Sequence, residues 1–265
     1  MTRANDRAID VALELAEQRF GVGRGTSAPG WARDRVRTVL EGQAVRHGAD
    51  LAAVAARLAS DHGAIEELVS ALRVGETRFY RDRAQWKACL HEVLPALPAS
   101  AEISALSAGC STGEEAYTLA MLLTVARRRF RVLGVDRSQT AIAAARAGIY
   151  AADSARDLPA PWASRFCEKV GEGLRVRPAL AEQVAFETCD LVERTPRGPF
   201  HIVFFKNVLL YLAAPAGEAV ATRLVRELAP GGLLFAASSE VLRLRQAGLA
   251  SVRIGGSITA FRARG

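Results

Sequence analysis

A glycine-containing loop followed by two carboxylates is the part of the sequence best suited to chemistry. Residues 106–120 read LSAGCSTGEEAYTLA, with an apolar run before Gly109 and a helical pattern that begins at Glu114. This order predicts a strand, a tight loop and a helix. In an open α/β sheet such a loop lies at the carboxyl end of a strand, where ligands bind. Glycine permits a positive φ and lets the backbone approach a ligand closely.

The two carboxylates that open this helix, Glu114 and Glu115, indicate the kind of ligand. A phosphate site would need exposed helix N–H groups and a nearby cation, and these carboxylates would repel a pyrophosphate. They suit a cationic or hydroxyl-rich ligand instead. The loop therefore favours a nucleoside such as S-adenosylmethionine over NAD or ATP.

Two aspartates follow predicted strands further along the chain. Asp136 ends an apolar strand about 20–25 residues after the loop, where an acidic residue accepts hydrogen bonds from ribose hydroxyls in nucleoside-binding folds. The alternative for Asp136 is the N-cap of the next helix, although Ser138 can fill that position. Asp190 follows the strand 184–188, and we expect it either to bond an adenine amino group or to be a turn residue.

Polar side chains also follow the apolar strand 200–205. That strand ends in Lys206 and Asn207, and Tyr211 comes four residues later. Polar groups that emerge at the end of a buried strand are expected to lie at the ligand crevice. A further polar segment, residues 75–82, contains Thr77 and Arg81 and lies where the helical part of the sequence meets the sheet part.

Apolar periodicity indicates which elements position these residues. Amphipathic patterns predict helices at 4–20, 31–47, 50–60, 63–73, 84–94, 114–127, 138–146 and 216–228. Short apolar runs predict strands at 102–107, 130–135, 184–188, 200–205, 232–237, 249–254 and 257–262. The alternation of strands and helices predicts an α/β fold with a doubly wound, mostly parallel sheet. The two glycines at 255–256 predict a hairpin, which makes the end of the sheet antiparallel.

Composition excludes several classes of protein. The 265 residues are 50% hydrophobic, which argues against a disordered chain. No apolar run reaches the roughly 18 residues of a membrane span, and the N-terminus lacks the apolar core of a secretory signal, so we expect a cytoplasmic protein without membrane insertion. The net charge is +7, which suggests an acidic partner or simply reflects base composition.

The cysteines and histidines predict no metal site. The spacing of Cys89, Cys110, Cys167 and Cys189 matches no metal or redox signature, and the four histidines do not cluster with them. We expect free thiols. Cys110 lies in the ligand loop, where we interpret it as a small loop residue and not a nucleophile.

Taken in order, these segments resemble the CheR-type chemotaxis-receptor methyltransferases. The family's T-x-F-F-R, C-S-T-G-E-E-x-Y and R-N-V-L-I-Y segments correspond to residues 77–81, 110–117 and 206–211. Its A-x-x-G-x-Y and P-G-G-x-L…S-E segments correspond to residues 145–150 and 230–240. The resemblance covers roughly residues 60–262 and is weaker over the N-terminal helices.

The resemblance implies a class I S-adenosylmethionine-dependent methyltransferase fold, Rossmann-like, with a seven-stranded sheet. It implies an N-terminal helical domain at 1–75 and a methyltransferase domain at 76–265, with a small β insertion at 151–183 that helps to dock receptors and contains a hairpin at 170–177. It also implies contacts with S-adenosylmethionine from Thr77, Arg81, Gly109, Glu114, Asp136, Asp190, Leu191 and Asn207.

The same resemblance implies that the protein forms glutamate methyl esters on the acidic cytoplasmic helices of chemoreceptors, as a monomer and without nucleic acid. Arg81 and Lys206 would hold the acceptor carboxylate, and Tyr211 would orient it. Two positions depart from the family: Gly75 replaces an asparagine, and Lys206 replaces an arginine and so lacks its bidentate fork. The alternatives are a methyltransferase of the same fold that acts on RNA or another protein, and a degenerate docking module that binds the cofactor without turnover.

Overall fold

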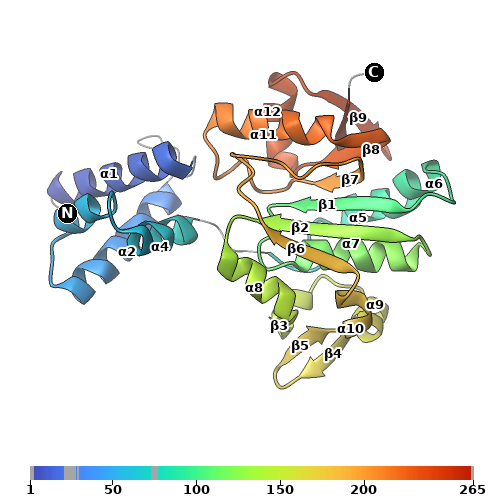
Figure 1. The fold of residues 1–265 in the computed structure, drawn as a ribbon, viewed down its shortest axis with the longest axis horizontal. Coiled ribbons are helices and arrows are strands. Elements are labelled where there is room, and N and C mark those ends of the chain that lie inside the picture. The colour runs from blue at the N-terminus through green and yellow to red at the C-terminus, as the bar shows by residue number, and fades with distance from the viewer. Residues whose placement is uncertain (1–2, 21–27, 29, 73–76, 264–265) are drawn as a thin grey trace. The chain divides into compact units, whose positions relative to one another are not determined.

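The computed structural model describes residues 3–20, 28, 30–72 and 77–263 (Figure 1). The chain divides into two compact units. The first, the helical unit, consists of residues 1–75 together with 207–219. The second, the sheet unit, consists of residues 76–206 together with 220–265.

The helical unit contains α1 (Arg3–Phe20), α2 (Gly30–His47), α3 (Leu51–Arg57) and α4 (His62–Leu72). Asp50 is the N-cap of α3, because its Oδ1 accepts the N–H of Ala53 at 2.8 Å. The apolar stripes of the four helices form one core, which includes Ile9, Leu13, Leu40, Leu58 and Leu68. Ion pairs join the helices at the surface, as between Arg33 and Asp10 at 2.6 Å.

The sheet unit is built on seven strands in the order β6-β2-β1-β7-β8-β10-β9. Their bounds are β1 (Ile103–Ala108), β2 (Phe130–Asp136), β6 (Val184–Thr188), β7 (Phe200–Phe204), β8 (Leu228–Phe235), β9 (Ala250–Ile254) and β10 (Ile258–Arg262). Neighbours from β6 to β8 are parallel, whereas β10 runs antiparallel to both β8 and β9. The α/β sheet with an antiparallel end is therefore confirmed. The predicted strand 232–237 begins earlier, at Leu228.

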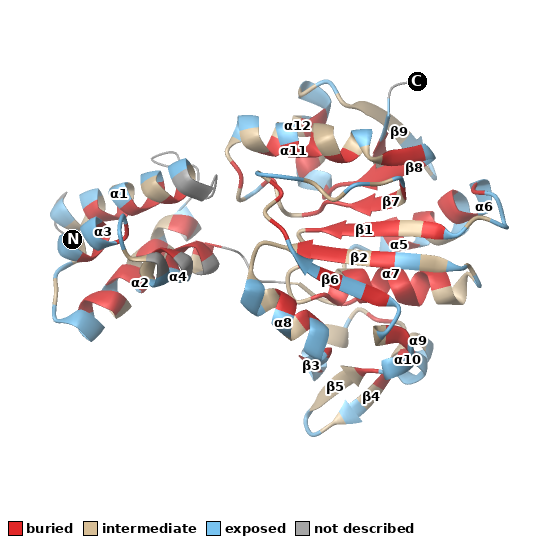
Figure 2. Ribbon diagram, viewed as in Figure 1, coloured by how far each residue is buried: buried red, intermediate tan, exposed pale blue. Residues whose placement is uncertain are grey.

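Helices cover the sheet. They are α5 (Arg83–Ala88), the π-helical turn η2 (Cys89–Val93), α6 (Leu94–Ala96), α7 (Glu114–Val125), α8 (Gln139–Ala147), α11 (Ala214–Arg226), the 3-10 turn η4 (Ser238–Glu240) and α12 (Val241–Gln246). The helix α7 contacts β1, β2 and β6, and α8 contacts β2 and β6. Burial concentrates along the strands β1, β7 and β8 (Figure 2). This pattern is expected for parallel strands with both faces covered.

A second, three-stranded sheet has the order β3-β5-β4. It comprises β3 (Ile149–Ala151), β4 (Cys167–Val170) and β5 (Gly173–Val176), all antiparallel, accompanied by η3 (Ala152–Ala155), α9 (Ala160–Phe166) and α10 (Pro178–Ala181). The hairpin expected at 170–177 is formed by β4 and β5, so its first strand begins before that range. The small sheet also uses β3, which precedes most of the predicted insertion.

Candidate active site

The parallel strands place the predicted site residues at one edge of the sheet. β1 is in register with β2, and Ala108, the last residue of β1, pairs with Val135. β2 is in register with β6, and Asp136 pairs with Thr188. The loop after β1, the aspartate at the end of β2 and the residues after β6 and β7 consequently share the carboxyl edge, where an open α/β sheet binds its ligands.

The loop after β1 is held tightly against β2. The N–H groups of Gly109 and Cys110 both donate to the carbonyl of Val135, at 2.8 and 2.9 Å. Gly113 has a φ of 97°, and a Cβ at this position would lie 2.8 Å from the Cβ of Ala145. The backbone of Gly113 therefore packs directly on α8, which fixes where α7 begins.

Asp136 fastens this loop through both of its carboxylate oxygens. Oδ2 accepts the N–H of Ser111 at 3.0 Å, and Oδ1 accepts the N–H of Ser138 at 2.9 Å. The N-cap of α8 is Ser138, whose hydroxyl accepts the N–H of Ala141. The alternative interpretation of Asp136 as that N-cap is therefore wrong. A carboxylate at this position is an acceptor of the kind that ribose hydroxyls require.

Glu114 is a buried carboxylate at the start of α7. The residue is 3% exposed, and its Oε2 accepts the hydroxyl of Thr112 at 2.7 Å. Burial raises the pKa of this carboxyl, and hydrogen bonds from Thr112 and Thr77 lower it in part. A carboxylate that is buried among hydroxyl donors is a suitable partner for an ammonium group, which would lower the pKa further.

Asp190 and Leu191 follow β6 at the same edge. The Oδ1 of Asp190 accepts the N–H of Val192 at 2.8 Å, and its Oδ2 lies 3.7 Å from the guanidinium of Arg137. Leu191 is 7% exposed. Asp190 thus has the local bonding of a turn residue. A turn role does not prevent its carboxylate from also accepting an adenine amino group.

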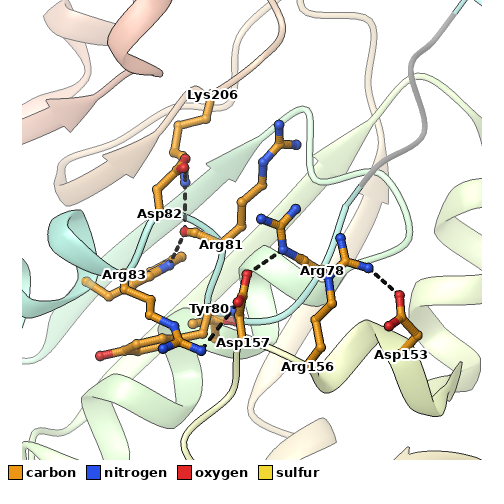
Figure 3. Close-up of polar contacts among 11 residues, drawn as sticks. Arg78, Tyr80, Arg81, Asp82, Arg83, Asp153, Arg156, Asp157 and Lys206 are labelled. Atoms are coloured by element: carbon orange, nitrogen blue, oxygen red, sulfur yellow. Dashed lines mark hydrogen bonds and ion pairs between the residues drawn. The ribbon is translucent and has the colours of Figure 1, made fainter.

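Arg81 lies in a network of charged residues between β7 and α5. Its carbonyl accepts the indole N–H of Trp86 at 2.6 Å and the ammonium of Lys206 at 3.3 Å. Lys206 also pairs with Asp82 at 2.9 Å (Figure 3). Its ammonium lies 3.7 Å from Glu115. Burial raises the pKa of Glu115, while the charge of Lys206 lowers it in part and that of Arg81 adds a smaller lowering effect.

Contacts of two arginines with Asp157 join residues 78–83 to the segment that connects β3 with β4. Asp157 accepts Arg78 Nε at 2.5 Å and lies 3.3 Å from Arg83 (Figure 3). Arg78 lowers the pKa of Asp157 through this hydrogen bond. The N–H of Phe79 also donates to the carbonyl of Ser154. Residues before and after Arg81 in the sequence are therefore bonded to residues 154–157.

Three of the sequence predictions concern residues outside the sheet unit or outside the described chain. Asn207 and Tyr211 belong to the helical unit, where Tyr211 packs against the core of the four helices. Their cofactor and catalytic roles stay predictions. Gly75, the departure from the family's asparagine, lies outside the described residues.

Sequence reasoning missed one residue that holds the loop. The hydroxyl of Tyr150, in β3, donates to the carbonyl of Thr112 at 2.7 Å. Burial and the charge of Glu114 raise the pKa of Tyr150, so it remains a donor. The sequence does contain a signal for Tyr150, because this residue ends the A-x-x-G-x-Y segment. Only the fold shows that its hydroxyl reaches the loop after β1.

The cysteines are free thiols, as expected. Cys110 is 1% exposed, and burial raises the pKa of its thiol well above the usual value, as does the charge of Asp136. A thiol with these properties is a poor nucleophile at neutral pH. Among the described residues, no His, Cys, Asp and Glu side chains gather in a group suited to a metal ion. None of the described helices has the length and apolar character needed to cross a bilayer.

Comparison with known proteins agrees with this geometry. The model of the CheR methyltransferase family, S-adenosylmethionine-binding domain, matches residues 75–254, more than half of the chain. The chain belongs to this family. It is thus a methyltransferase whose cofactor is S-adenosylmethionine, and the match covers the loop, the two aspartates and Lys206.

The similar proteins include chemotaxis enzymes. The protein named chemotaxis protein methyltransferase 1 of Pseudomonas aeruginosa is 27% identical over 85% of this chain and 87% of its own. An uncharacterised 104.1 kDa protein of Rhodobacter capsulatus is 30% identical over 75% of this chain, which spans only 22% of that relative. Among solved structures, the pyocyanin biosynthetic protein PhzM has a TM-score of 0.41 at 16% identity, covering 89% of this chain and 74% of its own.

Proposed function

We propose that the protein transfers a methyl group from S-adenosylmethionine to glutamate carboxylates of chemoreceptor cytoplasmic helices. The observation that supports this most directly is the loop after β1, with Glu114 buried at its end and Asp136 at the end of the neighbouring strand, in a chain of the CheR family. The printed name of the Pseudomonas aeruginosa relative supports a role in chemotaxis. We also propose that the protein acts in the cytoplasm as a monomer, without a nucleic-acid partner.

The site residues have roles that fit the parts of the cofactor. Glu114 and Thr77 suit the amino group of the methionine portion, and Asp136 suits the ribose hydroxyls. The backbone of Gly109 allows close approach. Asp190 and Leu191 suit the adenine, the first as an acceptor for its amino group and the second as apolar surface. When bound, S-adenosylmethionine supplies a methyl group that is attached to a positively charged sulfur. After transfer of the methyl group, the sulfur is left as a neutral thioether.

An ionised glutamate needs little help to act as the acceptor. The carboxyl group of an accessible glutamate is deprotonated near neutral pH, so no general base must remove a proton. The new bond joins a carboxylate oxygen to the methyl carbon, and the sulfur keeps the electrons of the bond that breaks. Rate enhancement then depends on aligning that oxygen with the methyl group. We propose that the guanidinium of Arg81 provides this alignment.

A transfer assay with methyl-labelled cofactor tests the proposed function. The purified protein is incubated with receptor-containing membranes, isolated receptor cytoplasmic fragments or RNA, and the products are treated with base. Methyl esters release labelled methanol in base, whereas amide and ring methyl groups do not. We expect base-labile label on the receptor fragments, and its loss when the receptor glutamates are replaced by alanine.

Other outcomes of the assay identify the alternatives. Base-stable label on RNA would indicate a nucleic-acid methyltransferase, and base-stable label on protein would indicate another acceptor atom. Binding of S-adenosylhomocysteine without transfer to a matched receptor would indicate a docking module. Each of these results contradicts the proposal.

A further inference from the structure

Lys206 is a buried cation at the end of the apolar strand β7. Its side chain is 2% exposed, and its ammonium lies 5.4 and 5.5 Å from the ring centroids of Trp86 and Phe204. A cation so far from water must be paired with anions or carbonyl groups. The partners of Lys206 therefore define what this residue does.

Two carboxylates and one carbonyl surround this ammonium. The ammonium lies 2.9 Å from the Oδ2 of Asp82 and 3.3 Å from the carbonyl of Arg81. The third contact is with Glu115 Oε2 at 3.7 Å. Because two carboxylates and a carbonyl already lie around this buried ammonium, a substrate carboxylate would have to compete with them for it.

The contacts of Lys206 converge on an unusual stretch of backbone. Tyr80 and Asp82, on either side of Arg81, have φ values of 59° and 63°, in the left-handed region that residues other than glycine rarely occupy. Backbone of this kind persists only where the surroundings hold it in place. Lys206 bonds the carbonyl of Arg81 and the side chain of Asp82, while Thr118 Oγ1 accepts the N–H of Tyr80 at 3.1 Å.

Glu115 connects the same cation to the strand beneath the loop. Its Oε1 accepts the hydroxyl of Ser107, on β1, at 2.8 Å, and its other oxygen faces Lys206. The network thus joins β1, α7 and β7 to residues 80–82. The adjacent Glu114, in contrast, accepts the hydroxyl of Thr112 in the loop after β1.

We propose that Lys206 is a positioning residue that fixes residues 80–82 and thereby the guanidinium of Arg81, and that it is not a ligand of the acceptor carboxylate. This revises the role that the sequence predicts for Lys206. The part of the proposal that concerns turnover rests on the proposed function, whereas the part that concerns the backbone of residues 80–82 does not.

Hydrogen–deuterium exchange tests the backbone part without any substrate. Lys206→Met should increase deuterium uptake in a peptide that covers residues 78–83, and Lys206→Arg should restore most of the protection. Lys87→Met is the matched control, because Lys87 is exposed on the neighbouring helix α5. Unchanged uptake in folded Lys206→Met would overturn the proposal.

A second variant covers the case in which Lys206→Met fails to fold. With 44% of its side chain accessible, Asp82 tolerates substitution, and Asp82→Asn removes the negative charge of the closest partner of Lys206. It should raise exchange in the same peptide. Normal protection in Asp82→Asn would contradict the proposal.

Kinetics on the methyl acceptor test how Lys206 acts. If it acts through Arg81, Lys206→Met should lower kcat at least about tenfold in the native background and less than about twofold in an Arg81→Lys background, because two residues that act as one unit are not additive. Fully additive losses, or a rise in acceptor KM at unchanged kcat, would show that Lys206 contacts the acceptor directly. A preparation that shows the exchange effects but no transfer to receptors would refute the proposed function alone.

Discussion

The acidic side chains at the carboxyl edge of the sheet are held by several kinds of donor. Asp136 accepts two backbone N–H groups, Glu114 accepts hydroxyls, and Glu115 faces an ammonium. These donors determine how each carboxylate is held. Both oxygens of Glu115 face partners inside the protein, the hydroxyl of Ser107 for Oε1 and the ammonium of Lys206 for Oε2.

Replacement of Asp136 should weaken cofactor binding. We expect Asp136→Ala to raise the Kd of S-adenosylhomocysteine at least about tenfold, equivalent to about 1.4 kcal/mol, because the variant loses the ribose acceptor and frees the N–H of Ser111. Isothermal titration calorimetry measures the change. Asp153→Ala is the control, since the side chain of Asp153 is 74% exposed and lies in η3. Equal affinities for native protein and Asp136→Ala would show that the ribose assignment is incorrect.

The thiols should react slowly in the folded protein. Burial raises the pKa of Cys89 to about 12 and that of Cys167 to about 11, so thiolate forms of both are scarce at pH 8. We expect a thiol-reactive chromophore at pH 8 to label the native protein slowly and all four cysteines at once in denaturant. A cysteine that reacts rapidly under native conditions would contradict this assignment of the thiols as structural.

At the scale of elements, close contact between α8 and the start of α7 determines where the loop lies. Gly113 is the point of contact, and the ring of Phe186, on β6, approaches the same position. The predicted strand–loop–helix order requires only a small residue here. The structure shows in addition that the residue must be glycine, because a positive φ and a close neighbour coincide.

Gly113→Ala should therefore destabilise the protein more than another glycine substitution at positive φ. Gly231 is the control, because its φ is 76° and an added Cβ would have no neighbour within 4 Å. Both variants introduce the backbone penalty, whereas Gly113→Ala alone adds overpacking, which typically costs about 1–3 kcal/mol. Urea denaturation compares the free energies of unfolding. Equal losses would mean that α7 can move away from α8 without penalty.

Local patterns predict the elements better than they predict the polar network. The apolar runs place β1, β2, β6 and β7 within a residue or two, because burial on both faces produces continuous hydrophobic segments. The pairing of Lys206 with Asp82 and Glu115 joins residues far apart in the chain, and no local pattern encodes it. The left-handed backbone at Tyr80 is equally invisible, since its sequence neighbours contain no glycine.

At the scale of the whole molecule, the helical unit is not one continuous stretch of chain. The family resemblance predicts a helical domain at residues 1–75, and the structure adds residues 207–219, which follow β7. Tyr211, within that added segment, packs against the core of the four helices. The family resemblance located the motif that contains this segment but not the core to which it belongs.

A fragment of residues 76–265 should be less stable than the intact chain. Removing the four helices leaves residues 207–219 without the apolar surface against which Tyr211 packs. We expect the fragment to melt at a lower temperature and to bind a hydrophobic dye, as measured by calorimetry and fluorescence. A fragment that matches the intact chain in both measurements would show that residues 207–219 fold independently of the helices.

The composite make-up of the helical unit also constrains how such proteins can diversify. A recombination event that exchanged only residues 1–75 would join new helices to an old segment, residues 207–219. The incoming helices would then meet a Tyr211 that had been selected against a different surface. Successful exchange requires that residues 1–75 and residues 207–219 are inherited together, so these two distant parts of the sequence should have the same ancestry.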